Sequence, residues 1–237
     1  MCALRMKIFS EPSPTVELVQ PHQLPIRDVP TRPWLSRMVR NGVDRLLALF
    51  ALVFFAPFFL IVAVLVAMSD GWPIFYSQYR VGQGGRLFRC YKFRTMNRNA
   101  DRLLDELLAN DLTAQEEWRE NQKLSNDPRV SCLGAFLRKT SLDELPQFWN
   151  VLKGDMAIVG PRPVVSSETW HYGHRIDEYT SVRPGITGLW QVSGRSDTSY
   201  DERVRLDCDY VARQSLLFDL SIMLKTVVVV LGRRGAR

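Results

Sequence analysis

The sequence predicts a helix-dominated α+β fold, in which one membrane-inserted helix, re-entrant in our interpretation, precedes a compact cytosolic domain with few short strands. Three observations support this fold class. A long apolar stretch without charged side chains follows the N-terminal segment. Only two later segments are rich in β-favouring residues. The rest of the chain shows helical spacing of apolar residues, broken by Gly and Pro.

Composition narrows the class of protein further. The chain has 237 residues and a formal net charge of +6, which suits one globular domain with accessory segments rather than a transporter with many spans. The positive charge favours anionic partners, such as phosphorylated small molecules, nucleic acid or an acidic membrane surface. The four cysteines lie far apart without a CxxC spacing. This distribution argues against a zinc site and a disulfide framework, and it suits a reducing compartment.

The N-terminal segment differs in composition from the rest of the chain. Residues 1–33 contain six prolines and show little apolar periodicity. Such a composition is typical of a disordered segment, here a cytoplasmic tail. We therefore expect a tail over residues 1–33, a membrane-anchoring segment over 34–70, and the main domain over 71–237.

The apolar stretch from Leu46 to Met68 reads LLALFALVFFAPFFLIVAVLVAM and predicts a helix inserted in a membrane. At 1.5 Å per residue it reaches roughly 34 Å, compared with about 30 Å for the hydrocarbon core of a bilayer. Pro57 near its middle has no N–H to donate to the carbonyl of Val53, so the helix is expected to bend there. Arginines flank both ends, which favours a re-entrant hairpin with two cytoplasmic ends. A Pro-kinked span is the alternative, because transmembrane helices tolerate proline.

The segments Pro73–Tyr79 and Leu87–Phe93 are predicted to pair as a β-hairpin around the glycine-rich residues 82–85. Helices separated by loops are predicted for the remainder. Their expected ranges are residues 99–124, 141–153, 164–181 and 200–231, with a glycine-rich loop over 183–195. The apolar segment 216–231 suits either a helix at the membrane interface or a packed core helix.

Asp143 and Glu144 are the leading candidates for chemistry. They fall in the first turn of the predicted helix 141–153, whose apolar face includes Trp149. Backbone N–H groups and the helix dipole favour negative charge at that position, which would keep Asp143 ionised as a nucleophile must be. The alternative is structural: Asp143 caps the helix, or Ser141 forms a capping box with Glu144.

Basic residues around this pair favour a phosphate-binding site. Arg162 lies between two prolines that stiffen the backbone, in Gly160-Pro161-Arg162-Pro163. Arg138 precedes the carboxylates, and Arg183 and Arg195 bracket a loop that contains Pro and Gly. A guanidinium on a rigid loop binds phosphate oxygens in bidentate fashion, as diphosphate recognition requires. Solubilising surface arginines are the alternative.

Two further patterns carry weaker indications. His171 and His174 are spaced to share one helical face, but no further ligand motif accompanies them, so a metal site there is not expected. Trp190 and Gln191 either stack on a nucleobase or pack in the interior. The sequence shows no Ser-His-Asp or Cys-His arrangement with a recognisable nucleophile elbow.

Four segments together resemble the bacterial sugar transferases, the polyprenyl-phosphate hexose-1-phosphate transferases also called monotopic phosphoglycosyl transferases. They are Lys92-Phe93-Arg94-Thr95-Met96, Ser141-Leu142-Asp143-Glu144-Leu145-Pro146-Gln147, the run from Lys153-Gly154-Asp155-Met156 into Gly160-Pro161-Arg162-Pro163, and residues 183–195. The likeness covers about residues 37–231 and keeps order and spacing. Through Glu117-Trp118-Arg119 and Asp127-Pro128-Arg129-Val130, the sequence resembles in particular the short exopolysaccharide-priming galactose-1-phosphate transferases of rhizobia.

The resemblance implies a reaction and a set of site residues. A hexose-1-phosphate passes from a UDP-sugar, UDP-galactose or otherwise UDP-glucose, to undecaprenyl phosphate, with release of UMP and with Mg²⁺ bound, as the priming step of exopolysaccharide synthesis. Asp143 would attack the sugar-bearing phosphorus to give an aspartyl-phosphosugar, and Glu144 would assist or, together with Asp143, hold the metal. The residues that match the family's phosphate-binding positions are Lys92, Arg94, Arg138, Arg162 and Arg195.

The family also implies a re-entrant helix broken at Pro57, with the catalytic domain on the cytoplasmic face of the bacterial inner membrane. Ala56 stands where relatives often carry Ser, whose hydroxyl can satisfy a freed carbonyl, so the bend is expected to be shallower or otherwise supported. The expected partners are UDP-hexose, undecaprenyl phosphate and the lipid bilayer. Nucleic acid is not expected, and a homodimer is one state compatible with the sequence. The alternative function is a non-catalytic, membrane-anchored basic module that binds anionic lipid or nucleic acid.

Overall fold

The computed structural model describes residues 34–121, 124, 126–194 and 198–232. The predicted tail, residues 1–33, lies outside the described residues. Helices dominate, and the strands found in the described ranges form two short two-stranded sheets, so the helix-dominated α+β class with few short strands is confirmed. In chain order the elements are α1 (Trp34–Phe54), α2 (Ala56–Asp70), β1 (Phe75–Val81), η1 (Gln83–Gly85), β2 (Leu87–Phe93), α3 (Ala100–Asn110), α4 (Leu112–Asn121), α5 (Cys132–Thr140), η2 (Leu142–Glu144), α6 (Gln147–Lys153), β3 (Ala157–Val159), η3 (Ser166–Arg175), α7 (Ile176–Thr180), β4 (Gly185–Thr187), α8 (Leu189–Ser193), α9 (Tyr200–Arg213) and α10 (Leu216–Leu231).

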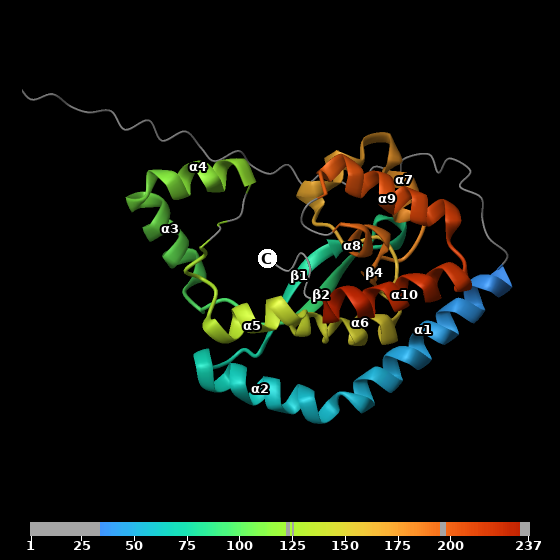
Figure 1. Ribbon diagram of the computed structural model, residues 1–237, viewed down its shortest axis with the longest axis horizontal. Helices are drawn as coiled ribbons and strands as arrows, with labels where there is room; N and C mark the ends of the chain where they lie inside the picture. The colour runs from blue at the N-terminus through green and yellow to red at the C-terminus, as the bar shows by residue number, and fades with distance from the viewer. Residues whose placement is uncertain (1–33, 122–123, 125, 195–197, 233–237) are drawn as a thin grey trace, which may run out of the picture.

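A bent pair of helices runs along one side of the molecule (Figure 1). The chain turns by 62° between α1 and α2, and Pro57 lies in the first turn of α2. The helix therefore breaks where the sequence predicts, because proline has no N–H for the carbonyl of Val53. Within the described residues no single helix is long and apolar enough to cross a bilayer, whereas the bent pair together meets that requirement by length and composition.

Buried ion pairs fix the first half of α1 to the rest of the chain. Arg40 pairs with Asp219 of α10 at 2.9 Å, and Asp44 pairs with Arg183 at 2.8 Å. Arg40 also donates to the carbonyl oxygen of Val159 in β3 at 2.7 Å. Each buried charge has a partner of opposite sign, without which burial would cost several kcal/mol. Helix α1 is thereby held against the strand that leads into the Arg162 loop.

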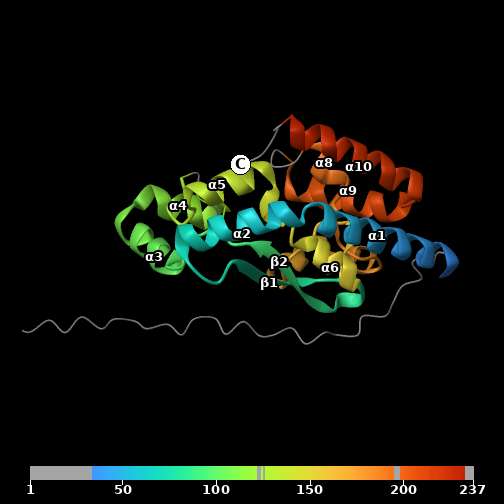
Figure 2. The ribbon, with the colours of Figure 1, turned by 90° about the horizontal axis from the view of Figure 1, so that it is seen from below.

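The bent pair and α10 expose large apolar side chains on their outer faces. Phe54 is 65% exposed, Met68 of α2 is 79% exposed, and Leu217 of α10 is 81% exposed. The inner face of α2 is different, since Val62 and Val66 pack in a core cluster with Phe93 and Leu137. Figure 2 shows that α10 lies beside α1, the first helix of the bent pair. Exposed apolar surface of this extent marks a surface that meets lipid or protein.

Strands β1 and β2 form the predicted antiparallel hairpin, with Tyr76 opposite Lys92. The turn between them contains Gly84 and Gly85, whose φ angles of 65° and 74° fall in the left-handed region that glycine tolerates best. The helices α3 and α4 stand away from the main body at one end of the molecule (Figures 1 and 2). The hairpin, in contrast, lies in the central part of the fold. Its second strand carries Lys92.

Strands β3 and β4 pair in parallel, with Ala157 opposite Gly185 and Val159 opposite Thr187. The prediction of a plain glycine-rich loop over 183–195 was therefore wrong, because this segment contains β4 and α8. Three-residue strands leave no periodic signal in the sequence. The pairing depends on close approach of the backbones, and the N–H of Gly160 donates to the carbonyl of Thr187 at 2.9 Å.

Replacing Gly185 by alanine is expected to destabilise the protein. A Cβ atom there would lie 2.1 Å from the nitrogen of Gly160 and 2.5 Å from the oxygen of Thr187. We expect a loss of at least about 2 kcal/mol in the free energy of unfolding, measured by thermal unfolding. Gly42→Ala on exposed α1 is the matched control, since its Cβ meets nothing within 4 Å. Equal melting temperatures for the two variants would contradict the close approach of the backbones at Gly185 and Gly160.

Several predicted helices are divided into shorter elements. A capping side chain or a glycine lies at each division. The predicted helix 99–124 is divided into α3 and α4, because the carboxylate of Asp111 accepts from the backbone N–H groups of Thr113 and Ala114. The range 164–181 is a 3-10 segment and the short α7, interrupted at Gly173 with φ 49°. The range 200–231 is divided into α9 and α10, and the hydroxyl of Ser215 accepts from the N–H of Phe218.

Candidate active site

Asp143 and Glu144 lie on the 3-10 turn η2 between α5 and α6. The prediction of one helix over 141–153 was wrong, because Ser141 takes a left-handed conformation with φ 58° and α6 begins only at Gln147. The side chain of Ser141 forms no capping hydrogen bond to this turn, and Pro146 stands at the N-cap of α6. Asp143 therefore does not cap the helix, and Ser141 does not form a capping box with Glu144. Trp149 also points outward, at 51% exposed, while Gly154 ends α6 as predicted.

Lys92 connects the two carboxylates from strand β2. Its Nζ atom lies 2.6 Å from Oε1 of Glu144 and 3.9 Å from Oδ2 of Asp143. Asp143 is only 7% exposed, so its carboxylate sits in surroundings of low polarity. An ion pair screened from water is stronger than one at the surface. The ammonium group therefore favours the ionised form of both carboxylates.

The two carboxylates have opposite pKa shifts. Burial raises the pKa of Asp143 to about 6; the charge of Lys92 acts against this rise and that of Glu144 adds to it. Burial acts in the same direction on Glu144, but Lys92 and Arg162 outweigh it, so the pKa of Glu144 lies below its ordinary value. The helix-dipole argument for Asp143 was therefore wrong in direction. Adjacent carboxylates with separated pKa values are typical of catalytic sites.

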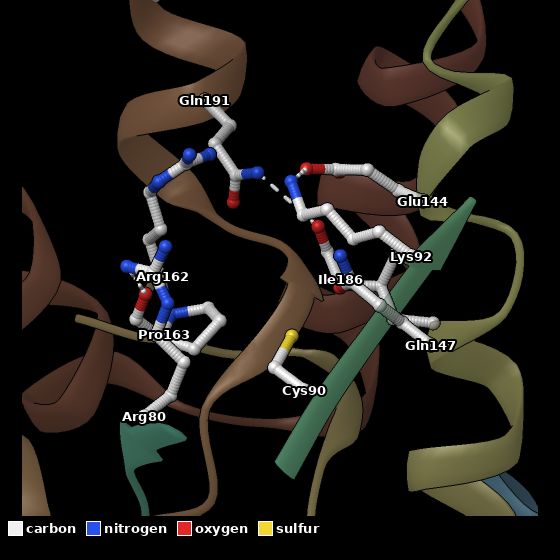
Figure 3. A pocket seen from close by; sticks show the side chains of 9 residues that line it. All are labelled: Arg80, Cys90, Lys92, Glu144, Gln147, Arg162, Pro163, Ile186 and Gln191. Atoms are coloured by element: carbon white, nitrogen blue, oxygen red, sulfur yellow. Dashed lines mark hydrogen bonds and ion pairs between the residues drawn. The ribbon is translucent and has the colours of Figure 1, made fainter. Parts of the chain in front are cut away.

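A pocket opens beside Lys92 and Glu144 (Figure 3). It contains about 270 Å³ of empty space, part of it open to solvent. Its lining combines three cationic side chains with two amides, one carboxylate and three weakly polar or apolar groups. The lining residues are Arg80, Lys92, Arg162, Gln147, Gln191, Glu144, Cys90, Pro163 and Ile186. Such an excess of positive charge next to a buried carboxylate suits a phosphorylated ligand.

The loop that carries Arg162 is held rigidly by its backbone. The hydroxyl of Tyr179 donates toward the carbonyl of Arg162 and accepts from the N–H of Val164, both at 3.1 Å. Arg80 donates to the carbonyl of Pro163 at 3.2 Å. No carboxylate of the described residues lies within ion-pair distance of the Arg162 guanidinium, so its charge is available to the pocket.

Asp207 supports the same loop from α9. It is 1% exposed and accepts a hydrogen bond from the hydroxyl of Tyr172 at 2.8 Å. Burial raises the pKa of Asp207 to about 7, although Tyr172 and the backbone N–H of Arg162 act in the opposite direction. No sequence pattern indicates this residue, because an aspartate on an amphipathic helix is ordinarily solvated.

The family of the chain follows from comparison with known proteins. A model of the bacterial sugar transferase family matches residues 35–233. The chain belongs to the bacterial sugar transferase family. It is 50% identical to the exopolysaccharide production protein ExoY of Sinorhizobium fredii, over 83% of this chain and 87% of that protein. It is 46% identical to ExoY of Rhizobium meliloti over 94% of this chain and 99% of that protein.

A third relative is longer than this sugar transferase. The undecaprenyl-phosphate galactose phosphotransferase of Salmonella typhimurium is 49% identical over 85% of this chain, which corresponds to 42% of that protein. The resemblance to this family, and in particular to its rhizobial members, is confirmed. The chain is thus an enzyme, a hexose-phosphate transferase. The alternative of a non-catalytic binding module is set aside.

The structure of the sugar transferase brings some of the predicted residues together and separates others. Lys92 and Arg162 line the pocket, and Arg138 lies close enough for its charge to lower the pKa of Asp143. Arg94 points away from the pocket, donates to the carbonyls of Asp70 and Gly71, and pairs with the Asp70 carboxylate at 3.4 Å. It therefore secures the end of α2 rather than a phosphate in this pocket. Arg195 lies outside the described residues.

Six pocket residues of the sugar transferase were not predicted as site residues: Arg80, Cys90, Gln147, Pro163, Ile186 and Gln191. Gln147 and Gln191 belong to the motifs quoted above, so their place in those motifs was the available signal. Arg80 and Cys90 lie on β1 and β2, where only the hairpin register reveals which side chains face the pocket. Trp190 is 7% exposed and lies beside Arg162 and Arg203, which favours packing over base stacking.

Asp143 and Glu144 are the described carboxylates of this site that could act as ligands of a magnesium ion together with substrate. Mg²⁺ is commonly bound by one or two carboxylates together with substrate phosphates. Asp143 and the ionised Glu144 supply such oxygens, Glu144 at the pocket wall. In the described ranges no cluster of three or more His, Cys, Asp or Glu side chains is placed to hold a metal. His171 is instead stacked between Trp170 and Tyr200.

Proposed function

We propose that this enzyme transfers a hexose-1-phosphate from UDP-galactose, or otherwise UDP-glucose, to undecaprenyl phosphate and releases UMP, as the priming step of exopolysaccharide synthesis. The observation that carries the proposal is the buried Asp143 carboxylate, paired with Lys92 at the edge of a cationic pocket. The names of the relatives support it, since two are exopolysaccharide production proteins and one is an undecaprenyl-phosphate galactose phosphotransferase.

The proposed reaction consists of two displacements at one phosphorus atom. In the first, a carboxylate oxygen of Asp143 forms a bond to the phosphorus that carries the hexose. The bond from that phosphorus to the UMP oxygen breaks, and UMP takes the electron pair. In the second, a phosphate oxygen of the lipid forms the new bond and the Asp143 carboxylate leaves with its electron pair. Two anionic substrates thereby use one site in turn.

The basic residues supply the charge that both displacements require. Lys92 lies between the carboxylates and, in the proposal, neutralises charge that moves onto the transferred phosphoryl oxygens. Arg162 and Arg80, on the opposite wall, face the phosphate that leaves with the nucleoside. Phosphoryl transfer depends mainly on such positioning and neutralisation. Mg²⁺, when held by Asp143 and Glu144, would neutralise further charge on the diphosphate.

The bent helix pair is the proposed membrane anchor. In this proposal α1 and α2 enter one leaflet and return, so that both ends stay on the cytoplasmic face of the bacterial inner membrane. The 62° turn at Pro57 and the exposed apolar faces of α1, α2 and α10 support it. A re-entrant anchor would keep the pocket at the level of the lipid headgroups, where a polyprenyl phosphate presents its charge.

Release of UMP tests the proposed function. Detergent-solubilised enzyme is incubated with undecaprenyl phosphate, Mg²⁺ and a panel of UDP-galactose, UDP-glucose and their N-acetylated counterparts. We expect release of UMP that depends on the lipid, fastest with UDP-galactose or UDP-glucose. A clearly faster release of UMP with an N-acetylated donor than with UDP-galactose and UDP-glucose would contradict the proposed identity of the sugar. The lack of lipid-dependent release with every donor would contradict the proposed reaction.

A further inference from the structure

Gln147 carries an amide that faces the pocket from a largely buried position. The side chain is 2% exposed, yet it lines the pocket together with Lys92 and Glu144. Among the described residues no side chain or backbone group is hydrogen-bonded to this amide, which meets the space of the pocket. Figure 3 shows the Gln147 amide directed toward Lys92 and Ile186. The amide therefore keeps its hydrogen-bonding capacity for a molecule that enters the pocket.

The chemistry of the amide restricts what that ligand offers. A carboxamide has two N–H donors and one acceptor oxygen. A phosphate at neutral pH has acceptors but no donor to match that oxygen, and Lys92, Arg80 and Arg162 already provide charge for phosphates. A hydroxyl both donates and accepts, so it can satisfy the oxygen of a glutamine while a neighbouring oxygen meets the N–H groups. Gln147 is therefore suited to a sugar hydroxyl.

The position of Gln147 indicates which sugar it meets. It follows Glu144 by three residues and lies on the same side of the pocket as Lys92, the partner of Asp143, whereas Arg162 lies across the pocket. Attacking and leaving oxygens stand on opposite sides of the phosphorus in an in-line displacement. The nucleotide consequently leaves away from Asp143, toward the Arg162 wall, and the hexose remains nearer the wall of Gln147. The hexose hydroxyl nearest to the phosphate is the one on C2.

We propose that Gln147 binds the C2 hydroxyl of the hexose that is transferred. This inference rests on the proposed function and extends it to a specificity-determining contact. Galactose and glucose share this hydroxyl, so Gln147 accepts both. It selects against 2-deoxy donors, which lack this hydroxyl.

The inference is tested by removing the two proposed partners separately and together. The steady-state kcat/KM of wild type and Gln147→Ala is measured with UDP-galactose and with UDP-2-deoxygalactose, in the presence of undecaprenyl phosphate. Wild type is expected to lose about tenfold or more with the 2-deoxy donor. Gln147→Ala is expected to lose as much with UDP-galactose, and to show almost no difference between the two donors. Inhibition by UMP is expected to stay unchanged.

Two controls keep the test decisive. Gln83→Ala removes an amide in the exposed hairpin turn and should retain wild-type discrimination. Gln147→Met keeps the side-chain length and replaces Gln147→Ala if thermal unfolding shows that the shorter side chain disrupts the fold. Equal losses with both donors, or weaker inhibition by UMP, would show that Gln147 serves the nucleotide or the fold and would overturn the inference.

Failure of the proposed function would be recognised separately. In that case wild type itself releases no UMP in response to lipid. Calorimetric binding of UDP-galactose and UDP-2-deoxygalactose to wild type and Gln147→Met then decides the inference without turnover. A wild-type preference for UDP-galactose that the variant loses supports the contact, and equal binding of both donors by wild type overturns it.

Discussion

Asp143→Asn is expected to abolish transfer from the UDP-sugar, with a fall in kcat/KM of at least about 1,000-fold. An amide oxygen is too poor a nucleophile to form the bond to phosphorus on which the proposed route depends. Asn has nearly the volume of Asp, so the fold and the membrane anchor should remain. Asp105→Asn on the exposed face of α3 is the matched control and should retain full activity. The measurement is lipid-dependent release of UMP.

Mass spectrometry of the intact protein examines the same carboxylate directly. After donor is added and the lipid acceptor is withheld, we expect a hexose-phosphate adduct on the wild-type protein and none on Asp143→Asn. An adduct in the variant, or wild-type turnover in which no adduct forms even after rapid quenching, would contradict a covalent role for Asp143. Residual activity near wild type in the variant would do the same.

The same substitution should make the protein more stable at neutral pH. The folded-state pKa of Asp143, about 6, lies above its ordinary value of 3.8. The folded protein therefore binds this proton more tightly than the unfolded chain, and stability falls as pH rises from about 4 to about 6. Asn carries no such loss, so we expect Asp143→Asn to gain about 1–3 kcal/mol at pH 7.5 and nothing below pH 4. Thermal unfolding across this range measures the difference.

Lys92→Met is expected to lower kcat at pH 7 by about 100-fold or more, because it removes the cation shared by the two carboxylates. Its charge lowers the pKa of Asp143 and of Glu144. Without it, the pKa of Asp143 rises further above about 6, and less of the proposed nucleophile is ionised at pH 7. The rate should increase with pH in both proteins, but the midpoint of this increase should move to higher pH in the variant.

The pH profile separates this role from a structural one. Lys92→Arg keeps the charge and should leave the midpoint of the rate increase near that of wild type, even if kcat falls. Lys153→Met, in an exposed ion pair with Asp155, is the matched control and should change neither rate nor midpoint. If Lys92→Met loses activity while its midpoint stays where wild type has it, the ammonium group does not set the pKa of Asp143.

Much of the local structure was predictable because its signals are local. Pro57 interrupts an apolar helix wherever it occurs, and alternating β-favouring residues around glycines specify the hairpin that carries Lys92. Gly154 ends α6 because glycine accepts the left-handed conformation at its φ of 90°. The helix over 141–153 was misplaced, since its apolar spacing continues from the 3-10 turn η2 across Pro146 into α6 and does not reveal the break between them.

The sequence by itself determined the apolar anchor with its break, the hairpin, and the carboxylate and basic residue types from which a phosphate site is built. Only the tertiary structure decided which of these residues meet. It placed Lys92 between Asp143 and Glu144. It bound Arg94 to the carbonyl at the end of α2 and brought Gln147 into the lining of the pocket. It also reversed the pKa shift expected for Asp143. Burial and charge pairing depend on segments that are distant along the chain, whereas sequence patterns report only on neighbours.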